Sequence, residues 1–147
     1  MYKIVIDTNV LLCALFSNRG GSFKLIKLLA TKAESDIFHN VVSVPLVLEF
    51  EEVLLREKNM KKYPHFNAED IKLVISDIVA ISKRTKLHFL WRPFLKYGYD
   101  DKVLETAVNG KADAIITFNT KDFVGVKKYF DIEILTPTEL YKKGVLL

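Results

Sequence analysis

The sequence predicts an α/β fold in which helices cover both faces of a parallel sheet. Segments with strand and helix patterns alternate along the 147 residues, a length typical of one domain. The strand-like segments are short apolar runs rather than apolar–polar alternations, as expected for strands that are buried on both faces. Half of the residues are apolar, which is enough for one hydrophobic core. We therefore expect residues 1–147 to form a single domain.

The first strand is expected over Lys3–Ile6, because this run is short and apolar. A helix follows over Val10–Phe16, for which Asn9 is a suitable N-cap. A second helix is expected over Phe23–Thr31, with Ser22 as its N-cap.

The middle of the chain is expected to form a strand and two longer helices. The strand covers Ile37–Val42 and leads into a long helix over Val44–Lys58. Ser43 is the expected cap of that helix, and Pro45 is tolerated in its first turn. A further helix over Ala68–Ser82 places its apolar residues on one face.

The last third of the chain continues the alternation. A short strand is expected over Leu87–Leu90 and a helix over Asp101–Asn109. Two more strands are expected over Ala114–Phe118 and Glu133–Leu135, and a final helix over Pro137–Lys143 ends before a glycine.

Composition narrows the classes of function. The chain has 22 Lys and Arg against 18 Asp and Glu, a net charge of +4 that permits binding to nucleic acid. No run of apolar residues approaches the ~18 that a membrane span needs, so we expect no membrane partner. The N-terminus lacks a signal-peptide pattern because Asp7 interrupts the apolar run. The single cysteine, Cys13, favours a reducing compartment, most simply the cytoplasm.

In a parallel sheet covered on both faces, ligands bind beyond the carboxyl ends of the strands, so polar residues there deserve a test. Asp7 directly follows the first strand, but it or Asn9 could simply cap the next helix. Glu49 lies on the flank of an apolar helical stripe, together with Glu52 and Arg56. That position also suits an ordinary solvated charge.

A third acidic position opens the helix that begins near residue 101. Acidic residues are favoured at a helix N-terminus, so capping explains one carboxylate of the pair Asp100-Asp101. The second adds like-charge repulsion that a bound cation would relieve.

Taken together, these segments resemble a known family. They are Ile4-Val5-Ile6-Asp7-Thr8-Asn9-Val10-Leu11, the helix with Leu48-Glu49, Asp101-Lys102-Val103-Leu104-Glu105-Thr106-Ala107 and Ala112-Asp113-Ala114-Ile115-Ile116-Thr117-Phe118-Asn119. Their order and spacing resemble those of PIN-domain nucleases over nearly the whole chain. The resemblance is nearest to the small stand-alone VapC-like proteins, the toxins of type II toxin–antitoxin systems.

This resemblance implies a three-layer α/β/α sandwich with a central parallel sheet. It also implies an Mg²⁺- or Mn²⁺-dependent endoribonuclease whose metal ligands are Asp7, Glu49 and Asp101, with Thr8 and Asn9 as supporting polar groups. A homodimer and a partner antitoxin that blocks the acidic cleft are implied in the same way.

The chain departs from the family pattern at the fourth acidic position. Asn119 stands where a carboxylate usually follows the strand, and Asp122 comes three residues later. Either Asp122 takes over that role, or it only begins the following turn. With Asn119 present, we expect one tightly held metal ion and a weaker second site.

The chemistry agrees with this assignment, because hydrolysis of a phosphodiester needs a hydroxide in line and charge neutralisation at the phosphoryl oxygens. Mg²⁺ or Mn²⁺ supplies both, and carboxylate oxygens are the ligands they prefer. Two other functions fit the same residues. One is a PIN-fold module that binds RNA or a partner with weakened catalysis, and the other is a phosphate-responsive signalling domain.

Overall fold

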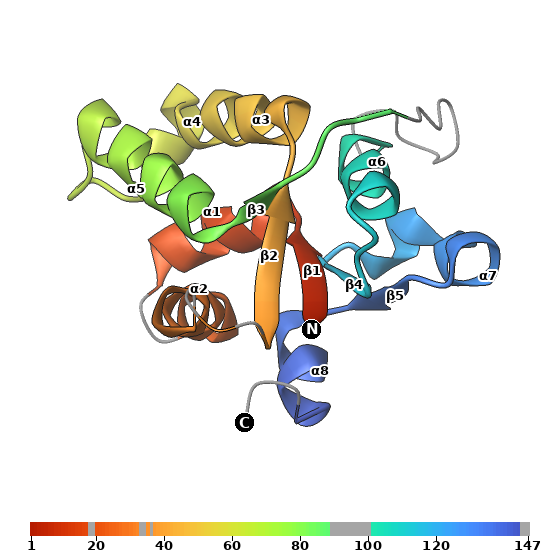
Figure 1. Cartoon of the computed structure of the whole chain (residues 1–147). Helices are drawn as coiled ribbons and strands as arrows, with labels where there is room; N and C mark the ends of the chain where they lie inside the picture. The colour runs from red at the N-terminus through yellow and green to blue at the C-terminus, as the bar shows by residue number, and fades with distance from the viewer. Residues whose placement is uncertain (18–19, 33–34, 36, 89–100, 145–147) are drawn as a thin grey trace.

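A computed structural model describes residues 1–17, 20–32, 35, 37–88 and 101–144. Its centre is a five-stranded, all-parallel sheet with the strand order β3-β2-β1-β4-β5 (Figure 1). The strands are β1 (Tyr2–Ile6), β2 (Phe38–Val42), β3 (Lys83–Arg84), β4 (Ala114–Ile116) and β5 (Glu133–Leu135). The predicted fold class is therefore confirmed.

The strands are added to the sheet in two opposite directions from β1. From β1 the strands are added toward β2 and β3, and the chain then crosses back to place β4 and β5 on the other side of β1. Crossovers between parallel strands are right-handed, so helices before and after this reversal cover opposite faces. In Figure 1, helices α1 to α5 gather to one side of β1 and β2, and α6 lies on the other. Such a reversal opens a crevice beyond the carboxyl ends of β1 and β4.

The helix that follows β1 begins earlier than predicted. Helix α1 covers Thr8–Phe16, and its N-cap is Asp7 rather than Asn9, because the Asp7 side chain accepts a hydrogen bond from the Thr8 N–H. Helix α2 covers Gly21–Thr31 and begins after Gly20, which makes no side-chain cap. The prediction of Ser22 as the cap was therefore wrong, since Ser22 is the second residue of the helix.

The long helix predicted over Val44–Lys58 is two helices, α3 (Val44–Leu54) and α4 (Glu57–Met60). Ser43 caps α3 as predicted. The break follows from side chains that bind the last carbonyl groups of α3. Asn59 Nδ2 donates to the Val53 carbonyl at 2.7 Å, and the Tyr63 hydroxyl donates to that of Leu54. These bonds occupy acceptors that a longer helix would use itself.

Helix α5 covers Ala68–Ile81 and begins with a capping box between Asn67 and Asp70. The strand after it is β3, not Leu87–Leu90: residues 87 and 88 form no strand, and 89 and 90 lie outside the described residues. Because β3 is a short edge strand with exposed side chains, it has no apolar run to reveal it.

Helix α6 (Asp101–Asn109) has the predicted bounds, and β5 does too. Strand β4 is shorter than predicted, because Thr117 and Phe118 already belong to the turn toward a 3-10 helix, η2 (Thr120–Phe123). Helix α7 (Val126–Phe130) was not predicted, and α8 (Pro137–Lys142) was. Among the described residues, no helix is long and apolar enough to cross a membrane.

Candidate active site

A cavity of about 570 Å³ lies beyond the carboxyl ends of β1 and β4. Its wall combines acidic, basic and amide side chains from α1, α3, α6 and the segment after β4. The lining residues are Asp7, Thr8, Asn9, Leu12, Glu49, Glu52, Val53, Arg56, Lys102 and Asn119. The cavity thus contains five of the seven residues that the sequence nominated, which are Asp7, Thr8, Asn9, Glu49 and Asn119.

Asp7 is placed by the sheet and held by its neighbours. Its N–H donates to the Ile116 carbonyl at 2.9 Å, which continues the pairing of β1 with β4. Its Oδ1 accepts from the Thr8 N–H at 2.7 Å, and its Oδ2 accepts from the Thr117 hydroxyl at 2.8 Å. Asp7 therefore caps α1 and also lines the cavity.

Glu49 is a buried carboxylate rather than a solvated surface charge, with 8% of the residue exposed. The Thr8 hydroxyl donates to Glu49 Oε2 at 2.7 Å, while the Thr8 N–H binds Asp7. One threonine thus connects two carboxylates that lie 42 positions apart in the sequence. This arrangement supports the predicted grouping of Asp7 with Glu49.

Thr117 is a site residue for which the sequence predicted no role. Its hydroxyl donates to Asp7 Oδ2. Thr117 Oγ1 also accepts hydrogen bonds from the Asn119 N–H at 3.0 Å and from Asn9 Nδ2 at 3.4 Å. Asn9 also accepts from the Phe118 N–H through Oδ1. Thr117 therefore links the polar residues after β1 to those after β4. The sequence prediction placed Thr117 inside the strand, and its position directly after the buried strand follows from the shorter β4 of the structure.

Asp101 is the first residue of α6 and is 1% exposed. Its neighbour Lys102 lines the cavity, but Asp101 is not part of the cavity wall. In the part of the chain that the structure describes, no group of three or more His, Cys, Asp or Glu side chains could hold a metal ion. The convergence of Asp101 with Asp7 and Glu49 stays a prediction, and Asp100 lies outside the described residues.

Asn119 and Asp122 differ in their relation to the cavity. Asn119 lines it, whereas Asp122 lies in η2 outside the wall. The negative charge of Asp122 nevertheless contributes to the raised pKa of Asp7.

Burial dominates the electrostatics of Asp7 and raises its pKa from 3.8 to about 6. Hydrogen bonds from Thr117 and Thr8 lower the pKa, and the charges of Glu49 and Asp122 raise it. A carboxylate that is costly to ionise without a counterion fits a bound cation. Since the donors are carboxylate oxygens, the site suits a hard divalent ion such as Mg²⁺ or Mn²⁺.

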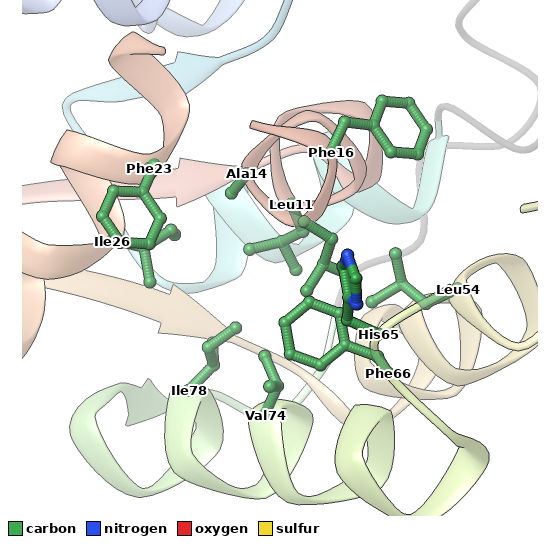
Figure 2. A pocket seen from close by; sticks show the side chains of 11 residues that line it. Leu11, Ala14, Phe16, Phe23, Ile26, Leu54, His65, Phe66, Val74 and Ile78 are labelled. Carbon is green, nitrogen blue, oxygen red and sulfur yellow. The ribbon is translucent and has the colours of Figure 1, made fainter. Parts of the chain in front are cut away.

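A second cavity, of about 560 Å³, lies on the other side of α1 and has a different character. Its wall is almost wholly apolar, and among the described residues His65 is the one titratable side chain that lines it (Figure 2). Leu11, Ala14 and Leu15 of α1 face this cavity, whereas Thr8 and Leu12 face the acidic one. Helix α1 thus separates an apolar cavity from the acidic one, and no carboxylate lines the apolar cavity among the residues that the structure describes.

Comparison with known proteins adds one finding. A family model described as PIN domain matches residues 3–121. The match spans Asp7, Glu49, Asp101 and Asn119 and ends one residue before Asp122. No curated protein sequence matches the chain.

We predict that metal-free protein loses stability as the pH rises from about 4 to 7. The pKa of Asp7 is higher in the folded state, so below about 6 the folded chain holds a proton that the unfolded chain releases near 3.8. The free energy of unfolding should fall by about 2 kcal/mol across this range from Asp7 alone. Asp7→Asn removes this dependence, which urea unfolding in EDTA at pH 4 and pH 7 would measure.

The matched control is Asp77→Asn, which removes an exposed carboxylate from α5. Its stability difference from the wild type should be the same at both pH values. If Asp7→Asn behaved like this control, burial of the Asp7 charge would carry no cost.

Proposed function

This chain belongs to the PIN-domain family, whose members are generally nucleases, and we propose that it is a ribonuclease that hydrolyses RNA phosphodiesters with Mg²⁺ or Mn²⁺. The observation that carries the proposal is the pairing of Asp7 and Glu49 on one cavity through Thr8. Two buried carboxylates are held close together where a parallel sheet binds its ligands. Ionising both carboxylates is unfavourable without a cation, and a bound cation would stabilise their charged forms.

In this proposal Asp7, Glu49 and Asp101 hold the metal ion. When bound, the ion neutralises charge on the phosphoryl oxygens and makes water a stronger nucleophile at neutral pH. The chain's own polar groups keep the ligands in place. Thr8 fixes one oxygen of each of two carboxylates, and Thr117 fixes the second oxygen of Asp7. Fixed ligands need little rearrangement as the reaction proceeds.

A second candidate is a PIN-fold module that binds RNA or a partner but cleaves weakly. The observation in its favour is Asn119, which lines the cavity without contributing a negative charge. The amide carbonyl can still accept a hydrogen bond or bind a cation weakly. The two candidates differ in whether RNA is cut.

We further propose that the protein is the toxin of a toxin–antitoxin pair, acts in the cytoplasm and forms a homodimer. The toxin role and an antitoxin partner rest on the resemblance to small stand-alone PIN proteins. The homodimer has structural support, because Val44 and Leu48 are 73% and 57% exposed on α3. These side chains lie one helical turn apart and form an apolar face beside β3.

We expect Mn²⁺-dependent cleavage of a mixed RNA pool by the wild-type protein. Asp7→Asn and Glu49→Gln should each reduce cleavage to the level seen in EDTA, because each removes a charged metal ligand. Glu69→Gln, at an exposed position of α5, is the control and should cleave like the wild type. RNA binding without cleavage by the wild type would favour the module.

Calorimetric titration with Mn²⁺ should give one tight site and a weak or absent second one. Asn119→Asp adds a carboxylate to the cavity wall and should tighten the second site. Asp122→Asn should weaken it only if the Asp122 side chain reaches the cavity once the metal binds. Two equally tight sites in the wild type would contradict this role of Asn119.

Induced expression should arrest the growth of a bacterial host, whereas Asp7→Asn at equal expression should not. Continued growth with an active wild-type ribonuclease would reject the toxin role alone. Light scattering at micromolar concentration should give the mass of a dimer, and a monomeric mass would reject the homodimer.

A further inference from the structure

The acidic cavity has two cations in its wall, and they come from different elements. Arg56 follows the C-cap of α3, Leu55, and is the N-cap of α4, whereas Lys102 is the second residue of α6. Four lining residues recur at intervals of one helical turn or less along this part of the chain, namely Glu49, Glu52, Val53 and Arg56. This stripe therefore presents an arginine at the same wall as the buried carboxylates.

Arg56 and Lys102 place positive charge beside the carboxylates of the cavity wall. Asp7, Glu49 and Glu52 give the wall three carboxylates, and a polyanion is repelled by them unless cations compensate. Within the described residues, Arg56 and Lys102 are the only Lys or Arg side chains that line this cavity. Lys127, by comparison, pairs with Asp131 away from the cavity.

Arg56 is held in place but remains available. Its Nη2 lies 3.1 Å from Glu52 Oε1, and the two side chains are 47% and 66% exposed. An ion pair this exposed contributes little to stability, so a phosphate can compete for the guanidinium. A guanidinium has five N–H donors in a planar fork that matches two phosphate oxygens.

We propose that Arg56 and Lys102 bind phosphates of the RNA backbone at this cavity, with Arg56 gripping one phosphate through two hydrogen bonds and Lys102 acting as a point charge. The inference rests on the proposed ribonuclease function and adds to it the residues that hold the substrate. Glu52 orients the guanidinium in the free protein and gives it up when RNA binds.

The test measures binding of a fluorescein-labelled, single-stranded RNA of mixed sequence by anisotropy, with Mn²⁺ and several KCl concentrations. The protein carries Asp7→Asn in all samples so that the RNA stays intact. Adding Arg56→Gln should weaken binding about tenfold and reduce the salt slope of log K by about 0.7, the value for one phosphate contact on a single strand. Lys102→Gln should reduce the slope by a similar amount. Arg56→Lys should keep the slope but lose part of the affinity.

Glu52→Gln is the matched control, because it breaks the same ion pair from the other side. It should bind RNA as tightly as its parent or more tightly, since it frees the guanidinium and removes a repelling charge. Lys72→Gln, on the exposed face of α5, should change neither affinity nor slope. If Glu52→Gln weakened binding as much as Arg56→Gln, the ion pair and not the phosphate contact would be responsible, and the proposal would fail.

Cleavage kinetics with Asp7 restored separate this proposal from the ribonuclease function. Arg56→Gln should raise KM and leave kcat nearly unchanged, as expected when an interaction equal in ground and transition states is lost. Cleavage with unchanged KM and salt slope would overturn the phosphate assignment only. Binding that depends on Arg56, without any cleavage, would overturn the ribonuclease only, and no RNA binding at all would overturn both.

Discussion

The parallel pairing of β1 with β4 is the constraint on which the whole site depends. Ile6 lies beside Ile116 in the register, so the residues that follow them leave the sheet next to each other. For this reason the Thr117 hydroxyl reaches Asp7, although 110 positions separate the two residues. A register slip of one residue would turn Asp7 toward the other face of the sheet and break its hydrogen bond with Thr117.

The site is assembled at the expense of stability. Asp7 gains hydrogen bonds from Thr8 and Thr117, and as the N-cap of α1 it lies at the positive end of the helix dipole. Burial outweighs these contributions, as the raised pKa of Asp7 records. The nearby carboxylate of Glu49 adds to the cost. Conflicts of this kind are expected at functional sites, where ligand binding compensates for a strained ground state.

Elements that depend on neighbouring residues in the sequence were predicted correctly, whereas elements that depend on distant side chains were not. Strands β1 and β2 and the cap Ser43 were predictable because apolar runs and cap chemistry are local properties. The end of α3 was not, since it depends on the Asn59 and Tyr63 side chains, which bind its last carbonyl groups. Strand β3 escaped prediction because an exposed edge strand of two residues has no pattern of its own.

The same distinction between local and distant interactions applies to the residues of the candidate site. Asp7 could be nominated from its place after a strand, whereas helical position alone left Glu49 ambiguous between a buried ligand and a solvated charge. In the structure its buried carboxylate accepts a hydrogen bond from Thr8, which belongs to another element. Thr117 gained its role only from the neighbouring strand, because a hydroxyl becomes informative through its partners. The grouping of Asp101 with the others rests on the family resemblance and not on a contact in the described residues.

The electrostatics of the cavity also give a physical reason for Asn119. Glu49 and Asp122 already raise the pKa of Asp7 toward neutrality, in addition to the larger effect of burial. A further carboxylate at position 119, on the same cavity wall, would repel Asp7 more strongly and favour its protonated form, which binds metal poorly. The amide keeps an oxygen donor at that position without this penalty. A neutral residue there therefore helps Asp7 remain ionised near pH 7, and any second cation must draw more of its negative charge from the phosphate that arrives with the RNA.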